Sequence, residues 1–231
     1  MPITICSTCC RSSTNDTTCD ECSTSLRADN DPIFYNFSII KQIAQILDIC
    51  PITLPDRTVV PSSYSDVTDG ELYQRLLHRE PDSFLTLTLN VDGVQPSKGS
   101  DQSLWPILFV INEISFRQRY AFEHVIVAGM WPGPKKPTRD YMSCFFEQIV
   151  DELLVLEQGH SFQLRTTSNE LKTVRLKVFL LLCSCDKPAG ALLQRIPEPN
   201  AAYDCSRCEI RGETSFHFTP RLEIAYVLKH S

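Results

Sequence analysis

The chain has 231 residues, 42% of them hydrophobic and 22% charged, which suits one domain of ordinary size with an appendage and excludes a chain that is disordered throughout. Its net charge of −6 argues against a protein that coats nucleic acid. The longest uninterrupted apolar runs, residues 107–111 and 178–183, are far shorter than the roughly 18 residues of a membrane-spanning helix. The first residues lack the pattern of a signal peptide, so the sequence predicts an intracellular protein outside the membrane.

Residues 1–27 contain two Cys-x-x-Cys pairs, Cys6 with Cys9 and Cys19 with Cys22. In a reducing compartment, paired cysteines more often bind metal than form disulfides. Each pair presents two thiolates on a tight turn, and four thiolates complete a closed tetrahedral site for a structural Zn²⁺. The segment is therefore predicted to be zinc-ribbon-like, with Cys10 as an alternative ligand to Cys9. The other interpretation is a disordered, reduced tail.

Residues 28–82 are predicted to be a linker and a helical segment. Asp31-Pro32 can cap a helix that ends by Cys50-Pro51. Its core-facing residues recur at helical spacing: Phe34, Phe37, Ile40, Ala44 and Leu47. After an extended connection over residues 51–67, the stretch from Thr68 to Glu71 resembles a capping box and opens a short helix through about Arg79.

Residues 83–196 change to a pattern of strands. Apolar and polar residues alternate over 83–92, and two more apolar segments follow at 104–114 and 124–131. Thr138 can cap a helix that ends near Gly159. Residues 174–183 are apolar on both faces, as in a central buried strand. The four cysteines of this part of the chain and of the preceding helix are interpreted as packing residues: Cys50, Cys144, Cys183 and Cys185.

The order of three strands, a helix and a fourth strand predicts an α/β protein with a ribonuclease H-like mixed sheet and flanking helices. In that fold the first three strands form a meander and the fourth lies parallel beside the first. Asp92 closes the first strand and Asp186 closes the fourth, so the topology brings the two carboxylates together. Two neighbouring carboxylates suit Mg²⁺ or Mn²⁺ and phosphoryl transfer. Alternatively, Asp92-Gly93 only turns a hairpin and Asp186 only caps a helix near Pro188.

Residues 115–140 carry five basic side chains against two acidic ones. A local basic stretch can hold phosphates even in an acidic protein, and a solvated loop face is the alternative interpretation. The candidate contacts to a DNA backbone are Arg117, Arg119, Lys135 and Lys136.

Four successive segments resemble landmarks of cut-and-paste transposases, namely Leu89-Asn-Val-Asp-Gly93, Leu104-Trp-Pro-Ile107, Cys185-Asp-Lys-Pro-Ala189 and Asp204-Cys-Ser-Arg-Cys208. The segment Asp69-Gly-Glu-Leu-Tyr73 resembles the stretch that precedes the first strand in these proteins. The resemblance runs from about residue 66 to 218. It is to the CACTA (En/Spm)-type group and the related animal transposase domain-containing proteins.

This resemblance implies a DDE/D acid set that cleaves and joins DNA at element ends, with Asp92 as the first acid and Asp186 as the second. The family places its third acid well beyond the Cys-x-x-Cys segment, and none is assigned here before Ser231. The sequence is therefore predicted to be the front part of a transposase, or a decayed or domesticated derivative of one, incomplete for catalysis. Residues 197–231 are predicted to hold an inserted knuckle and a C-terminal helix, with a second zinc site formed by Cys205, Cys208 and His217.

Two functions follow as hypotheses. The first is a transposase-derived nuclear protein that binds DNA, whose ancestral activity is metal-dependent cleavage and strand transfer. The second is a non-catalytic, zinc-dependent module that binds DNA or protein. Structural Zn²⁺, and Mg²⁺ or Mn²⁺ for an active site, are the expected metals. DNA and a second copy of the chain are the candidate partners, and no small-molecule cofactor is expected.

Overall fold

A computed structural model describes residues 2–15, 17–27, 31–52, 54, 57, 63–95, 97, 103–133, 136–166 and 170–197. The strands are β1 (Pro2–Ile5), β2 (Ser12–Ser13), β3 (Ile33–Asn36), β4 (Phe84–Val91), β5 (Trp105–Ile111), β6 (Val125–Trp131), β7 (His160–Arg165) and β8 (Leu171–Cys183). The helices are α1 (Ile39–Ile49), α2 (Glu71–Arg79), α3 (Phe116–Arg119), α4 (Arg139–Glu157) and α5 (Lys187–Gln194). Among the described helices, none is both long enough and apolar enough to cross a bilayer.

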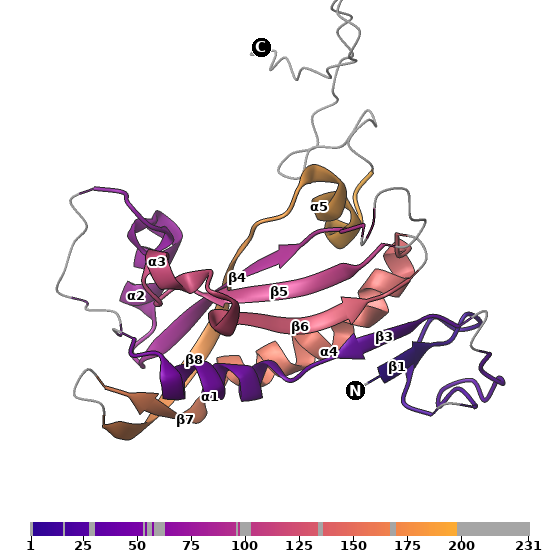
Figure 1. The fold of residues 1–231 in the computed structure, drawn as a ribbon, viewed down its shortest axis with the longest axis horizontal. Helices are drawn as coiled ribbons and strands as arrows, with labels where there is room; N and C mark the ends of the chain where they lie inside the picture. The colour runs from indigo at the N-terminus through magenta and orange to yellow at the C-terminus, as the bar shows by residue number, and fades with distance from the viewer. Residues whose placement is uncertain are drawn as a thin grey trace, which may run out of the picture.

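The strands form one mixed sheet in the order β2-β1-β3-β6-β5-β4-β8-β7 (Figure 1). β4, β5 and β6 are an antiparallel meander, and β8 pairs with β4 in parallel, with Leu89 opposite Cys183. The predicted meander with a parallel fourth strand is therefore confirmed, whereas β7, which lies between α4 and β8 in the chain and pairs antiparallel with β8, was not predicted. β1 and β3 extend the same sheet beyond β6, so the cysteine-rich segment is attached to its edge.

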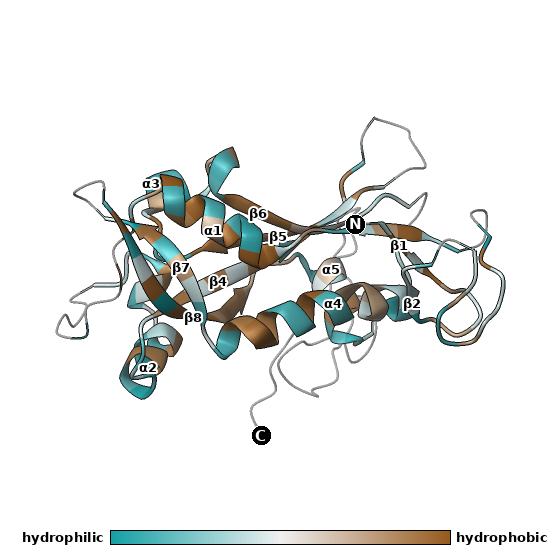
Figure 2. Ribbon diagram, turned by 90° about the horizontal axis from the view of Figure 1, so that it is seen from below, coloured by the Kyte–Doolittle hydropathy of each residue, from teal (hydrophilic) through white to brown (hydrophobic). Residues whose placement is uncertain are grey.

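The main hydrophobic core lies between the sheet and the helices α1 and α4. Leu85, Leu87, Leu89 and Val91 point to one side of β4, as the alternating sequence predicts, and all are buried. Both helices alternate polar and apolar residues along their length (Figure 2), which gives each an apolar side for this core. A smaller cluster on the other side of β4 joins Phe84 to α2.

The first predicted helix is wrong at its start. Residues 33–36 form β3, which pairs with β1 and β6, and α1 begins only after Ser38. Along β3, Phe34 is buried while Tyr35 is exposed, which is the period of a strand. The Ser38 hydroxyl caps the helix, and the carboxylate of Glu152 accepts hydrogen bonds from the Ser38 hydroxyl and from the next two backbone amides. The predicted end at Cys50 is confirmed.

Two further details differ from the prediction. The capping box is formed by Asp66 and Asp69 around a single 3₁₀ turn, and α2 then starts after Gly70 without a side-chain cap. β8 is not buried on both faces, because Leu180 is 40% exposed and Leu182 is 36% exposed near its carboxyl end. The helix capped by Thr138 is confirmed as α4, and it ends where Gly159 takes a positive φ of 93°.

Candidate functional site

The two predicted acids follow the carboxyl ends of neighbouring parallel strands. The Ser184 amide donates to the Leu89 carbonyl at 2.7 Å, and the Asn90 side-chain amide donates to the Ser184 carbonyl at 2.6 Å. These bonds hold the segment that leads to Asp186 against the end of β4. Asn90, which makes the second bond, lies two residues before Asp92. Both carboxylates are exposed. Figure 1 shows α5 beside this end of β4, whereas α2 and α3 lie at the other end of the sheet.

Asp186 also has a local structural role. Its Oδ1 accepts a hydrogen bond from the Ala189 amide at 2.7 Å and caps α5, whose first turn contains Pro188. The capping interpretation of Asp186 is therefore confirmed, and capping occupies only one of the two carboxylate oxygens.

Asp92-Gly93 does not form a tight hairpin turn, because β4 and β5 stay paired beyond it. The Val94 and Leu104 backbones exchange hydrogen bonds of 2.7 and 2.8 Å. Glycine is required at position 93 for another reason: a Cβ there would lie 2.6 Å from the indole of Trp105. The site therefore has an indole packed directly beside the residue that follows Asp92.

The three candidate DNA contacts that the structure describes are not brought together. Lys136 is exposed, and its Nζ lies 6.0 Å from the centre of the Trp105 ring, at the same end of the sheet as Asp92. Arg117 is exposed on α3, at the opposite end. Arg119 is 3% exposed and is bound to Asp66, which contradicts the prediction that it contacts DNA. Lys135 lies outside the described residues.

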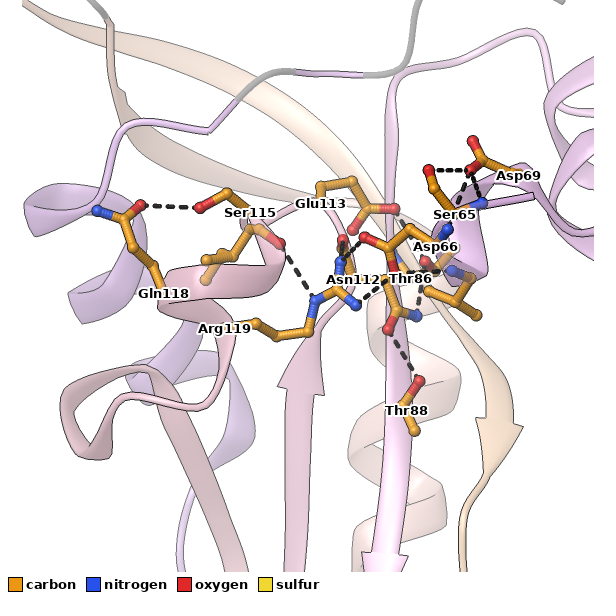
Figure 3. Close-up of polar contacts among 12 residues, drawn as sticks. Ser65, Asp66, Asp69, Thr86, Thr88, Asn112, Glu113, Ser115, Gln118 and Arg119 are labelled. Atoms are coloured by element: carbon orange, nitrogen blue, oxygen red, sulfur yellow. Dashed lines mark hydrogen bonds and ion pairs between the residues drawn. The ribbon is translucent and has the colours of Figure 1, made fainter. Parts of the chain in front are cut away.

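Arg119 belongs to a buried polar network at the α3 end of the sheet (Figure 3). This network was not predicted from the sequence. Its Nη1 and Nη2 donate to the two carboxylate oxygens of Asp66 at 2.8 and 2.6 Å, and its other donors bind the Ile114 and Asn112 carbonyls. This hydrogen-bonded ion pair holds the pKa of Asp66 below its usual range. The guanidinium is fully engaged inside the protein, so it serves the fold.

Glu113 lies in the same network. Its carboxylate accepts hydrogen bonds from the Thr86 amide at 2.9 Å and from the Thr86 hydroxyl at 2.8 Å. Burial raises the pKa of Glu113 to about 7, although these hydrogen bonds favour the charged form. The sequence signal that marks this network is weak: three polar residues, 112, 113 and 115, interrupt the apolar run at the end of β5.

The four predicted zinc ligands converge. The ligand sulfurs of Cys6, Cys9, Cys19 and Cys22 all lie within 4.8 Å of one another. Cys6 Sγ is 3.7 Å from Cys22 Sγ, and Cys9 Sγ is 3.6 Å from Cys19 Sγ. Four sulfurs at roughly 2.3 Å from a central Zn²⁺ would be about 3.8 Å apart, so the cluster has the size of a tetrahedral metal site. It could hold a metal ion.

Backbone turns position these sulfurs. The Cys10 amide donates to the Cys6 carbonyl at 2.8 Å, and the Ser23 amide donates to the Cys19 carbonyl at 3.0 Å, which closes each knuckle. Cys10 itself has a positive φ of 54° and packs against the main core, so Cys9 and not Cys10 belongs to the cluster that could hold an ion. The buried carboxylate of Asp31 links the first cysteine turn to the segment after the second. It accepts hydrogen bonds of 2.6 Å from the Ser7 amide and from the Arg27 amide.

The four thiols differ in acidity. Partial burial, together with hydrogen bonds to the neighbouring thiols, raises the pKa of Cys9 to about 12. The hydrogen bond with Thr24 lowers the pKa of Cys22 to about 6. Thiolate is the form that binds metal, so the exposed Cys22 is the sulfur best prepared to receive an ion.

Within the described residues, these four cysteines are the only group of three or more histidine, cysteine or acidic side chains whose ligand atoms come together. Asp92 and Asp186 are thus a pair of carboxylates without a described third partner. The second predicted zinc site, Cys205, Cys208 and His217, lies outside the described residues.

Comparison with known proteins supplies the family. No curated protein and no solved structure matches the chain significantly. The family model described as transposase family tnp2 matches residues 72–228, which include both predicted acids. This match covers more than half of the sequence and agrees with the transposase landmarks quoted above. The chain therefore belongs to the tnp2 transposase family.

Proposed function

We propose that the chain is a transposase-derived protein of the CACTA (En/Spm) type that associates with DNA, with Asp92 and Asp186 as two acids of a site for DNA cleavage and strand transfer. The observation that carries this proposal is the parallel pairing of β4 with β8, which ends both strands at the same edge of the sheet. Ligands of open α/β sheets bind at the carboxyl ends of such strands.

The strand order supports a ribonuclease H-like core. β6, β5, β4 and β8 lie side by side, the first three antiparallel and the last parallel to β4, with α4 between β6 and β8 in the chain. In this arrangement the central strand β4 supplies the first acid, and its parallel neighbour β8, which follows α4 and β7 in the chain, supplies the second. The tnp2 family match supports DNA as the partner and, with it, a nuclear location.

Two exposed carboxylates on adjacent strand ends suit a hard cation with oxygen ligands, Mg²⁺ or Mn²⁺. Asp186 would bind it through Oδ2 while Oδ1 continues to cap α5. When bound, such an ion would activate the attacking oxygen in phosphoryl transfer. The cationic Lys136, held near the Trp105 ring at this end of the sheet, is the candidate contact to a DNA phosphate.

The four-cysteine cluster is the proposed site of a structural Zn²⁺. The sulfur separations fit a tetrahedral ion, and all four positions are filled by protein ligands, which leaves none for catalysis. β1 carries the cluster into the sheet through β3 and β6, so zinc binding would stabilise the edge of the same sheet that carries the two acids.

A second candidate function is a zinc-dependent module that binds DNA or protein without cutting DNA. The observation that favours it is the arrangement of metal ligands. In the described part of the chain, the cysteine cluster is a complete ligand set, whereas the two carboxylates are only a pair. Phosphoryl transfer by two metal ions requires more ligands than two carboxylates provide.

Substitution of the acids distinguishes the two functions. Asp92→Asn and Asp186→Asn keep the size of each side chain, and asparagine at 186 still caps α5. The full chain would be incubated with plasmid DNA and Mn²⁺, with nicking followed on gels and binding followed by mobility shift. Asp151→Asn, which changes an exposed acid on α4, is the matched control.

The transposase chemistry predicts that nicking by the unaltered chain and by Asp151→Asn disappears in both acid variants while DNA binding remains. Nicking that survives in Asp92→Asn would exclude Asp92 from the reaction. DNA binding without nicking in every protein, the unaltered chain included, would favour the non-catalytic module.

A further inference from the structure

Two cysteines outside the metal cluster lie side by side at the end of β8. Cys183 Sγ and Cys185 Sγ are 3.3 Å apart. Cys183 is exposed and Cys185 is partly buried against the main core. The interpretation of both as packing residues is therefore wrong for Cys183, whose thiol faces solvent.

The separation of these sulfurs is close to what a disulfide requires. A disulfide bond is about 2.05 Å long, so the two sulfurs must approach by little more than an ångström. β8 ends at Cys183, and residues 184–186 have no regular secondary structure, so side-chain rotation and a small backbone change can close this gap. The other cysteines of the described core, Cys50 and Cys144, are buried and have no such partner among the described residues.

Cys185 also touches the strand that carries the other acid. The Val91 amide donates a hydrogen bond to Cys185 Sγ at 3.3 Å. Cys185 directly precedes Asp186 in the chain, and its sulfur contacts Val91, which directly precedes Asp92. Any reaction at this sulfur changes the end of β4 and the start of α5 together.

We propose that Cys183 and Cys185 are a redox-active pair that forms a reversible intramolecular disulfide by exchange with a low-molecular-weight disulfide of the glutathione type. Closure of the disulfide draws Cys185 Sγ away from the Val91 amide and loosens the end of β4. The thiol chemistry does not require the two acids to be catalytic, so it stands or falls separately from the proposed function.

The exchange takes two steps. The exposed Cys183 thiolate attacks one sulfur of the small disulfide, which releases one small thiol and leaves a mixed disulfide on Cys183. The Cys185 thiolate then attacks Cys183 Sγ and releases the second small thiol. The protein pair loses two electrons and two protons, and the small disulfide gains them. The hydrogen bond from Cys185 lowers the pKa of Cys183 to about 7, which supports Cys183 as the attacking thiol.

Peptide mapping of the full, zinc-loaded chain tests the exchange directly. After incubation with oxidised glutathione, free thiols are alkylated and the chain is digested with trypsin. Because trypsin does not cleave between Lys187 and Pro188, both cysteines fall in one peptide, 178–195, which contains no other cysteine. We expect this peptide to lose both alkyl labels and two hydrogen atoms, and to regain both labels after reduction.

Two variants provide the controls. Cys183→Ser cannot close the bridge and retains one label on Cys185, whereas Cys10→Ser removes a core cysteine elsewhere and leaves the reaction unchanged. Hydrogen exchange of the peptide that contains Val91 should quicken on oxidation in the unaltered chain and in Cys10→Ser but stay constant in Cys183→Ser. A doubly labelled peptide 178–195 after oxidation would overturn the proposal. A bridge that forms without any change at Val91 would overturn its structural consequence.

Discussion

Arg119 is a buried structural residue and not a DNA contact, so we expect Arg119→Ala to lower the stability of the chain. In the native chain the guanidinium is 3% exposed and donates to both oxygens of Asp66 and to the carbonyls of Ile114 and Asn112. Alanine removes every one of these donors. The Asp66 carboxylate and the two backbone carbonyls then lose the hydrogen bonds that, in the folded chain, take the place of hydrogen bonds to water.

The magnitude follows from burial. Breaking a fully buried ion pair from one side costs about 3–5 kcal/mol, because the remaining charge is stranded. The side chain of Asp66 is 24% exposed, so water can reach it and the lower end of this range applies. We therefore expect Arg119→Ala to lower the free energy of unfolding by about 3 kcal/mol at neutral pH. Arg119→Lys should lose an intermediate amount, because an ammonium group cannot bind both carboxylate oxygens and both carbonyls at once.

Urea denaturation followed by tryptophan fluorescence is a suitable assay, since Trp105 and Trp131 are both buried in the native core. Arg117→Ala is the matched control: it removes an exposed arginine from the same helix and should change stability by less than about 0.5 kcal/mol. A loss below about 1 kcal/mol for Arg119→Ala, or equal losses for the two variants, would refute the argument.

The same ion pair has a defined pH dependence. The pKa of Asp66 is lowered from its usual 3.8 in the folded chain, so its contribution to stability is present above 3.8 and is lost as the pH falls through the lowered folded value. The difference in unfolding free energy between the unaltered chain and Arg119→Ala should therefore shrink in strong acid. If the difference stays constant down to pH 2, the loss of stability in Arg119→Ala does not arise from the charge of Asp66.

Three further predictions concern other parts of the chain. Gly93→Ala should lower the free energy of unfolding in urea by about 1–3 kcal/mol, because its Cβ would lie 2.6 Å from the indole of Trp105. Gly190→Ala should raise it by about 0.5–1 kcal/mol, because Gly190 lies in α5 and a Cβ there has no neighbour within 4 Å. The pKa of Glu113 is raised from 4.5 to about 7, so this group stabilises the folded state below pH 4.5, and the contribution is lost as the pH rises through about 7. The unfolding free energy of the unaltered chain, measured from pH 4 to 8, should therefore show a decline that is missing in Glu113→Gln. Cys19→Ser should abolish stoichiometric zinc in metal analysis of the purified chain, and Cys10→Ser should retain it.

Each of these predictions has a contrary outcome. Destabilisation of similar size in both glycine variants would mean that backbone freedom matters at both positions and that the indole contact is not the cause. A stability difference between the unaltered chain and Glu113→Gln that is constant over pH would show that the pKa of this carboxyl is the same in the folded and the unfolded chain. Zinc retained in Cys19→Ser, or lost in Cys10→Ser, would contradict the ligand set.

Much of the fold is readable from local patterns. The alternation over residues 84–91 predicts β4 and its buried face because side chains of a strand alternate between its two sides. The hydroxyl of Thr138 marks the start of α4, and Gly159 marks its end, since both effects act within a few residues. The placement of Asp92 and Asp186 after neighbouring strand ends follows from strand order alone, because a parallel fourth strand ends beside the first.

Residues 33–37 show why local patterns fail elsewhere. Phe34 and Phe37 fit the spacing of a helix as well as they fit other structures, and nothing nearby in the sequence excludes a helix. The choice is made by backbone partners that lie far away, β1 at the N-terminus and β6 about a hundred residues later. Strand pairing is non-local, so a sequence window of a dozen residues does not contain the information.

The sequence by itself determined α4, the antiparallel meander of β4, β5 and β6 with β8 as its parallel neighbour, the two cysteine pairs and the positions of Asp92 and Asp186 at strand ends. It did not predict β1, β2, β3 or β7. Only the tertiary structure decided which side chains are satisfied within the protein. It placed Cys9 in the four-cysteine cluster and packed Cys10 on the core. It also bound Arg119 to Asp66, across 53 positions of sequence. Burial and long-range pairing decide such roles, and both arise only once the chain has folded.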